Sequence, residues 1–176
     1  LIVNCCESPQ PKFTLDEIPL IPLPRLVNKS EELLNVNKIQ SIKIYDSDKI
    51  LNPIGNHLRA LWEDHTSKEL VIIHDDLDLN PTISLEIKND LFSNDEAYTV
   101  KIGIDKIKIT GKTAEGVYRG VKTLEQVLKL NDFNDNSNKL FLPGGEITDQ
   151  PSYEYRGAML DVSRHFFSVS DVKRYI

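Results

Sequence analysis

The chain has 176 residues, enough for a domain with a substantial core, and its 40% hydrophobic and 27% charged residues are typical of globular proteins. This composition excludes a disordered, collagen-like or membrane-spanning chain. The formal net charge of −6, with scattered Lys and Arg, argues against nucleic-acid partners, because binding a polyanion requires clustered basic side chains.

The N-terminal segment combines two cysteines with a run of prolines. Cys5 and Cys6 are adjacent, so they are badly placed to close a disulfide loop, which excludes a disulfide framework. The apolar residues before them suit either a frayed tail or the remnant of an export signal with a lipid on Cys5 or Cys6. The second alternative predicts an exported protein (periplasmic, cell-surface or secreted), a lipoprotein whose only membrane contact is that lipid. The prolines of residues 7–24 predict an extended lead-in, with the core beginning near Leu33.

The next stretch predicts a strand, a helix and a second strand. Residues 39–44 have the apolar character of a strand, and within residues 51–65 apolar side chains recur at i, i+4, i+7 and i+8 from Ile54. This spacing indicates an amphipathic helix. The segment "KELVIIHDD" is a short β-branched run bounded by charge, which predicts a strand buried on both faces.

Three alternating segments follow, and then a second helical pattern. "TISLEI", "AYTVKIGI" and "KIKIT" alternate apolar and polar residues, which predicts strands of a mostly antiparallel sheet with a turn at residues 103–105. From Thr113 to about Leu130 the apolar residues change to a helical period, with Thr113 as the expected N-cap. We interpret Gly144-Gly145 as a turn before Ile147.

This order of elements predicts an α+β fold, in which a small sheet carries helices. We assign residues 1–19 to a tail or linker and residues 20–149 to one α+β domain. The sequence changes character near Pro151, so a second domain is expected over residues 150–176. It would begin with a strand at residues 155–161 and continue into a short helix with Ser170 as N-cap.

Two patterns suggest a metal but fail its requirements. Asp76, Asp78 and Asn80 fit the first ligand positions of an EF-hand loop, yet Pro81 and Ile87 stand where that loop needs Gly and a bidentate Glu. The four histidines form no His-Glu-x-x-His motif and no i, i+4 pair. We therefore expect no metal site. The sequence also lacks a Gly-x-Ser-x-Gly elbow and a phosphate-binding loop, which argues against serine nucleophiles and nucleotide hydrolysis.

Arg156 is the charged residue that most needs an explanation. In the expected strand it lies on the same side as Ala158 and Leu160, with Asp161 at the other end, so charges would flank a buried element. A buried guanidinium needs an acceptor. That acceptor would be a protein carboxylate or the hydroxyl groups of a substrate. Spacing alone favours the carboxylate.

Several segments together resemble family 20 glycoside hydrolases, the β-N-acetylhexosaminidases. "YRGAMLDVSRHFFSVSDVKRYI" is similar to the opening of their catalytic (β/α)₈ barrel. "NDEAYTVKI", "KIKITGKTAEGVYRGVKTLEQVL" and "LPGGEITDQPSYEYRG" resemble the smaller α+β domain that precedes it. The likeness covers residues 20–176, in the family's order. Arg119 and Lys122 depart from the pattern, which more often has an aromatic residue and a glutamine there.

The resemblance implies retaining hydrolysis of terminal β-linked N-acetylglucosamine or N-acetylgalactosamine on a glycan or chitin-type oligosaccharide. The 2-acetamido oxygen of the sugar would attack the anomeric carbon, a glutamate would protonate the leaving oxygen, and a neighbouring aspartate would orient the acetamido group, an exception to the two-carboxylate scheme. No metal or organic cofactor is implied.

The resemblance assigns one substrate contact and no catalytic residue to this chain. Arg156 matches the family's arginine that hydrogen-bonds hydroxyls of the terminal sugar, while Asp161 and His165 match motif positions that we interpret as structural supports. No Asp-Glu pair follows Asp161, so the 176 residues alone are expected to be inactive. The alternative is a non-catalytic accessory module for structure or carbohydrate binding.

Overall fold

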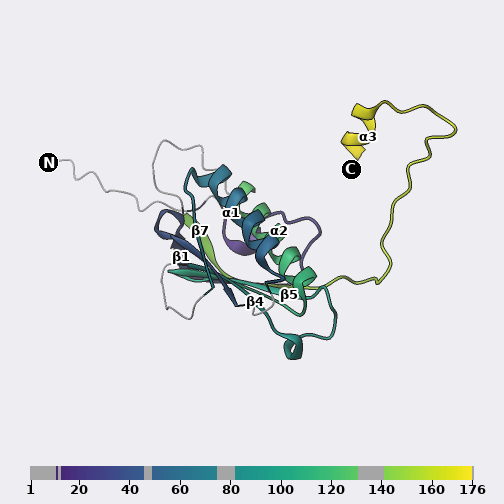
Figure 1. Ribbon diagram of the computed structural model, residues 1–176. Helices are drawn as coiled ribbons and strands as arrows, with labels where there is room; N and C mark the ends of the chain where they lie inside the picture. Colours follow the sequence, from purple (N-terminus) through teal and green to yellow (C-terminus); the bar gives the residue numbers. More distant parts are fainter. Residues whose placement is uncertain (1–10, 12, 46–48, 75–81, 131–140, 176) are drawn as a thin grey trace.

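A computed structural model describes residues 11, 13–45, 49–74, 82–130 and 141–175. Seven strands form one sheet in the order β1-β7-β5-β6-β4-β2-β3, and two long helices cover one of its faces (Figure 1). The predicted α+β class is confirmed. The strands are β1 (Leu26–Asn35), β2 (Ser41–Tyr45), β3 (Val71–Ile73), β4 (Thr82–Ile87), β5 (Tyr98–Ile102), β6 (Lys106–Gly111) and β7 (Phe141–Asp149).

The sheet is mixed, so the prediction of a mostly antiparallel sheet was wrong. β2 runs parallel to β3 and β4, and β4 runs parallel to β6. β5 is antiparallel to β6 and β7, and β7 is antiparallel to β1. A helix lies between β2 and β3 in the chain, and such a crossover returns the chain in a parallel direction. Alternation shows which face of a strand is covered but not the direction of its neighbour.

Both predicted long helices are confirmed as α1 (Asn52–Thr66) and α2 (Ala114–Leu130). α1 ends where Ser67 adopts a left-handed conformation (φ 54°) and donates its N–H to the carbonyl of Glu63. Thr113 directly precedes α2, and its carbonyl accepts the first helical hydrogen bond from Val117 N–H at 3.1 Å. The short 3-10 helices are η1 (Leu15–Glu17), η2 (Val36–Lys38) and η3 (Asn89–Leu91).

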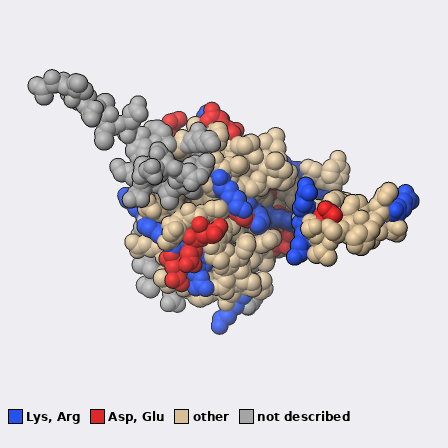
Figure 2. Space-filling model, turned by 90° about the horizontal axis from the view of Figure 1, so that it is seen from above, with Lys and Arg blue, Asp and Glu red and all other residues tan. Residues whose placement is uncertain are grey.

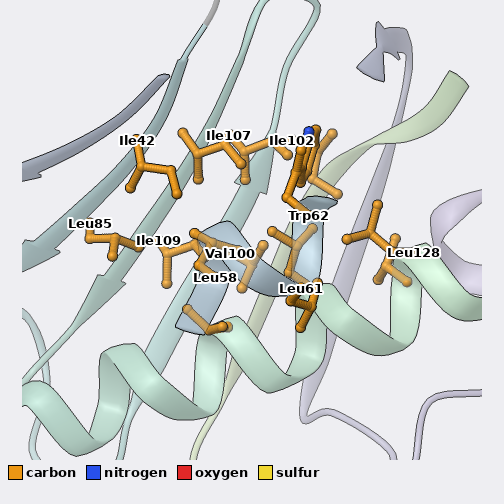
Figure 3. Packing of buried hydrophobic residues seen from close by; sticks show 14 of the residues in the cluster. Ile42, Leu58, Leu61, Trp62, Leu85, Val100, Ile102, Ile107, Ile109 and Leu128 are labelled. Carbon is orange, nitrogen blue, oxygen red and sulfur yellow. The ribbon is translucent and has the colours of Figure 1, made fainter. Parts of the chain in front are cut away.

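The core lies between the helices and one face of the sheet. Figure 3 shows Leu58, Leu61 and Trp62 of α1 among the inward side chains of the strands. Alternate strand residues such as Ile107 and Ile109 are fully buried on this side. The opposite face of the sheet is polar, as the alternation predicts, and carries cross-strand contacts such as the hydrogen bond from the Ser41 hydroxyl to the Thr82 hydroxyl at 3.0 Å.

The lead-in contributes to the core, contrary to the expectation that the core begins near Leu33. Leu15, Ile18 and Leu20 are each at most 5% exposed. The side chain of Gln126 on α2 holds the segment, because it accepts from Ile21 N–H and donates to Ile21 C=O, both at 2.9 Å. The prolines exclude regular helix but allow the single turn of η1. Cys5 and Cys6 lie outside the described residues.

Two further strand predictions were wrong. The strand in "KELVIIHDD" is not buried on both faces, because β3 is the last strand of the sheet and Val71 is 64% exposed. Gly144 and Gly145 lie inside β7 and form no turn. A Cβ at Gly144 would lie 2.6 Å from the Glu32 carbonyl, so glycine is needed where β1 crosses closely.

The expected strand at residues 155–161 does not form. These residues are irregular and almost all exposed. A strand needs neighbouring N–H and C=O groups, and the preceding strand β7 is already paired on both sides, with β1 and β5. The described residues after 150 contain no second strand to pair with.

The last element is the short helix α3 (Val169–Tyr175), at the end of an extended segment that leaves the domain (Figure 1). Its N-cap is Ser168 and not the expected Ser170. Asp171 N–H donates to the Ser168 hydroxyl at 3.2 Å, and Ser168 N–H donates to the Asp171 carboxylate at 3.1 Å, a reciprocal cap. None of the helices in the described ranges is long and apolar enough to cross a membrane.

Candidate functional site

The C-terminal segment contacts the domain through Arg156, the residue that the sequence singles out. Arg156 Nη2 donates to Glu96 Oε2 at 2.5 Å, and Nη1 donates to the carbonyl of Tyr153 at 2.6 Å. The Arg156 side chain is 41% exposed, so the expectation of a buried arginine was wrong. Of the two acceptors considered for it, the structure contains the protein carboxylate.

Glu96 is held in place by its own loop and by α2. It lies just before β5, where its N–H donates to Asn94 Oδ1 at 2.9 Å. Arg119 on α2 approaches the same oxygen as Arg156, with both Nε and Nη2 at 3.1 Å from Oε2. Arg119 also pairs with Glu115 at 2.8 Å, one turn earlier. We call these four charged residues the Glu96 network: Glu96, Glu115, Arg119 and Arg156.

The Glu96 network favours the charged form of each partner. The hydrogen bond from Arg156 is the largest cause that holds the pKa of Glu96 below its ordinary value; partial desolvation opposes it, and Arg119 adds to the lowering. The same hydrogen bond raises the pKa of Arg156. Two carboxylates and two guanidinium groups balance one another, so the network carries no net charge at neutral pH.

Arg156 keeps hydrogen-bonding capacity for another molecule. A guanidinium carries five N–H donors. Two of them are used, by Glu96 and the Tyr153 carbonyl, and the others donate to no residue of the described part of the chain. A half-exposed planar group with several donors suits recognition of neutral hydroxyl groups. It does not suit proton transfer, because arginine stays protonated in proteins.

Asp161 and His165 do not join this network. Asp161 Oδ1 accepts from Ser163 N–H at 2.9 Å and from the Ser163 hydroxyl at 2.7 Å, which lowers the pKa of the carboxyl. Its carboxylate also pairs with Arg164 at 3.2 Å. His165 is exposed. Asp161 therefore supports a local turn. The expected support of a strand end by Asp161 and His165 stays a prediction, since residues 155–161 form no strand here.

A hollow of about 290 Å³ lies within the C-terminal segment itself. It is lined by Leu160 and Phe167 and by three residues of α3, Asp171, Arg174 and Tyr175. Its walls are formed by α3 and by residues that precede that helix, with one acid and one base among them.

No group of three or more His, Cys, Asp or Glu that could hold a metal occurs in the part of the chain that the structure describes. Asp76, Asp78, Asn80 and Pro81 lie outside it.

A second polar cluster, which the sequence does not indicate, fixes the end of β7. The Tyr98 hydroxyl lies 2.6 Å from the Thr123 hydroxyl and donates to Asp149 Oδ2 at 3.4 Å. Arg25 N–H donates to the other oxygen of Asp149 at 3.2 Å. These residues come from β5, α2, β7 and the lead-in, so only the tertiary fold brings them together. The cluster holds the chain immediately before it reaches Arg156.

The Tyr98 cluster predicts a loss of stability at alkaline pH. Burial is the main cause that raises the pKa of Tyr98 from 10.0 to about 12. The raised value favours folding below pH 10, and this contribution, about 2–3 kcal/mol, is lost as the pH rises from 10 to 12. Urea unfolding of the chain and of Tyr98→Phe should therefore show the wild-type advantage shrinking by about that amount between pH 9 and pH 12. Parallel profiles for the two proteins would contradict this assignment.

Surface charge gives no sign of a polyanion site on the face of the domain seen from above. Figure 2 shows acidic and basic side chains next to each other over this face, and the basic ones do not gather into one continuous patch. Ion pairs also join opposite charges on the surface, such as Lys112 with Asp95 at 2.8 Å. The absence of nucleic-acid partners stays a prediction from the net charge and the scattered basic residues.

Two family models match the chain in succession. Residues 17–150 match "Glycosyl hydrolase family 20, domain 2". Residues 153–176 match "Glycosyl hydrolase family 20, catalytic domain". The first match covers the sheet and both long helices, and the second covers the extended segment that carries Arg156 and α3.

Individual relatives agree with these matches. The chain is 32% identical over 161 residues to a "Beta-hexosaminidase" of Porphyromonas gingivalis, covering 90% of this chain and 20% of that protein. It is similar in structure to a GH20 beta-N-acetylhexosaminidase from Streptomyces coelicolor, with TM-score 0.71 and 31% identity, covering 95% and 33% of the two chains. A mutant Streptomyces plicatus beta-hexosaminidase in complex with product GlcNAc gives TM-score 0.70 and 30% identity, covering 94% and 32%. The chain thus spans a fifth to a third of these relatives.

Proposed function

Because this chain belongs to glycosyl hydrolase family 20, as its sequence resemblance implied, we propose that it is the N-terminal part of a β-N-acetylhexosaminidase. The whole protein would remove terminal β-linked N-acetylglucosamine or N-acetylgalactosamine from a glycan or chitin-type oligosaccharide. The names of the Porphyromonas and Streptomyces relatives support the activity, and the GlcNAc bound to the Streptomyces plicatus protein supports the sugar.

The proposed reaction is retaining and substrate-assisted, with the acetamido oxygen of the sugar as nucleophile. The groups that donate the proton and orient the acetamido group would come from parts of the catalytic domain beyond residues 153–176. Within this chain the proposal gives Arg156 one role, which is to bind hydroxyl groups of the terminal sugar. The proposal divides the chain as the sequence suggests, with the α+β domain at residues 20–149 and the catalytic domain from residue 150.

One observation carries the proposal for Arg156. It lies six residues after the α+β domain match ends, inside the segment that matches the catalytic domain, and several of its N–H groups have no acceptor in the described part of the chain. The match of that segment to a catalytic domain also favours an enzyme over the alternative of a non-catalytic module. Export, with a lipid on Cys5 or Cys6, stays a proposal that rests on the N-terminal sequence.

Replacement of Arg156 tests the proposal in the full-length protein. Arg156→Ala should lower kcat/KM on 4-nitrophenyl N-acetyl-β-glucosaminide about 10- to 100-fold, because a hydrogen bond to a charged group is worth about 1.5–3 kcal/mol. Lys101→Ala removes a cation from the open face of the sheet, where Lys101 pairs with Glu146 at 3.7 Å, and should leave the rate unchanged.

Two outcomes would count against the proposal. An inactive full-length protein would remove the assignment as a hexosaminidase. An active protein in which Arg156→Ala behaves like Lys101→Ala would remove the sugar-binding role. The 176-residue chain, assayed in parallel, should show no turnover, because residues 153–176 alone supply no acid that matches the mechanism. Hydrolysis by this chain would show that the catalytic groups lie within the 176 residues, contrary to the proposal.

A further inference from the structure

We propose that Glu96 is a positioning residue for Arg156, so that the α+β domain helps to form the sugar site and does more than support the barrel. The inference rests on the proposed function, since it gives Arg156 the same task. What it adds is the cause of the arginine's orientation: the carboxylate of Glu96, which belongs to a different domain from Arg156 and lies 60 residues earlier in the chain.

Glu96 is placed independently of Arg156. Its N–H is capped by Asn94 Oδ1, and the following Ala97 is buried and donates to the Asn94 carbonyl at 3.0 Å. Arg119 then holds the carboxylate by two contacts of 3.1 Å from a helix that is packed on the sheet. The acceptor oxygen is therefore fixed by β5 and α2 before the C-terminal segment reaches it.

The charge balance of the Glu96 network also favours the presence of Arg156. Glu96, Glu115 and Arg119 together carry one excess negative charge, and Arg156 neutralises it. Arg119 stands where the family more often has an aromatic residue, so this chain shares one carboxylate between two guanidinium groups. Glu96 therefore contacts the Arg156 guanidinium through a single nitrogen, Nη2.

Orientation matters because an arginine side chain loses much rotamer entropy when it is fixed. The two hydrogen bonds to Glu96 and the Tyr153 carbonyl both use terminal nitrogens and set the plane of the guanidinium. The remaining donors are then presented without a further entropic cost when the sugar binds. Loss of Glu96 should therefore weaken sugar binding while the reacting groups stay intact.

A double-mutant cycle in the full-length enzyme tests this role. Glu96→Gln should raise KM on the 4-nitrophenyl substrate about tenfold with kcat within about twofold. In an Arg156→Ala background the same change should alter kcat/KM by less than about twofold, because its effect passes through Arg156. Asp95→Asn is the matched control. It removes a carboxylate from the same loop that pairs with Lys112 and should leave KM unchanged.

The outcomes separate the possible explanations. If Glu96→Gln lowers only the thermal midpoint, or has the same effect with and without Arg156, Glu96 is merely structural and the inference is overturned. If Glu96→Gln does not fold, Arg119→Gln replaces it, since it loosens the carboxylate without removing it, and it should raise KM by a smaller factor. An inactive wild-type enzyme would overturn the proposed function and this inference together, whereas an active one insensitive to Glu96→Gln overturns the inference alone.

Discussion

Replacing Trp62 by alanine is expected to lower the free energy of unfolding of the 176-residue chain by about 3–5 kcal/mol. Trp62 is the single tryptophan and is fully buried between α1 and the sheet, close to Ile102 in Figure 3. Its removal would leave a cavity that rigid strands on one side cannot fill. Urea unfolding followed by circular dichroism measures the change, since the variant has no tryptophan fluorescence.

A milder variant separates the packing contribution from the polar one. The indole Nε1 of Trp62 is buried with no hydrogen-bond partner among the described residues. Trp62→Phe keeps most of the apolar volume and removes this unpaired N–H, so it should cost clearly less than Trp62→Ala. Ile104→Ala, at a 64% exposed turn position, is the surface control and should stay within about 0.5 kcal/mol of wild type. If Trp62→Phe and Trp62→Ala lowered the free energy of unfolding equally, the apolar volume kept by phenylalanine would add no stability. Packing would then not be the main contribution of Trp62.

Replacing Gly116 by alanine is expected to cost about 2–3 kcal/mol, although alanine is the better helix former. Gly116 lies in the first turn of α2, where a Cβ would stand 2.4 Å from the carbonyl oxygen of Ala97 and 3.3 Å from the Cα of Gly111. Both neighbours are backbone, so neither can rotate away. The helix would have to move off the sheet, and chemical denaturation would report the loss.

Gly120, one turn further along α2, is the matched comparison. A Cβ there would meet side chains, at 2.6 Å from Ile109 Cγ2 and 3.3 Å from Tyr98 Cδ2. Side chains can change rotamer, and the helix propensity of alanine offsets about 1 kcal/mol. Gly120→Ala should therefore be less destabilising than Gly116→Ala. The reverse order would show that side-chain packing on this helix is less adaptable than the backbone contact.

The two missed strands show what local pattern cannot reveal. β1 has no alternation, because it is an edge strand whose residues, such as Ser30 and Glu31, are mostly exposed. β7 contains a pair of glycines that is typical of a turn. β1 forms because it pairs with β7, which is also paired with β5, and β1 bulges between Lys29 and Leu33 where it passes the glycines. That pairing joins residues more than 100 positions apart.

The sequence alone was sufficient for the α+β class, the two long helices and strands β2, β4, β5 and β6, because the periodicity of buried residues is a local property of each segment. It also contained the motifs that resemble family 20. Only the tertiary structure decided strand direction, the burial of the lead-in and the pairing of Arg156 with Glu96. Those features depend on which distant segments meet, and a carboxylate 60 residues away leaves no local signal beside the arginine that it holds.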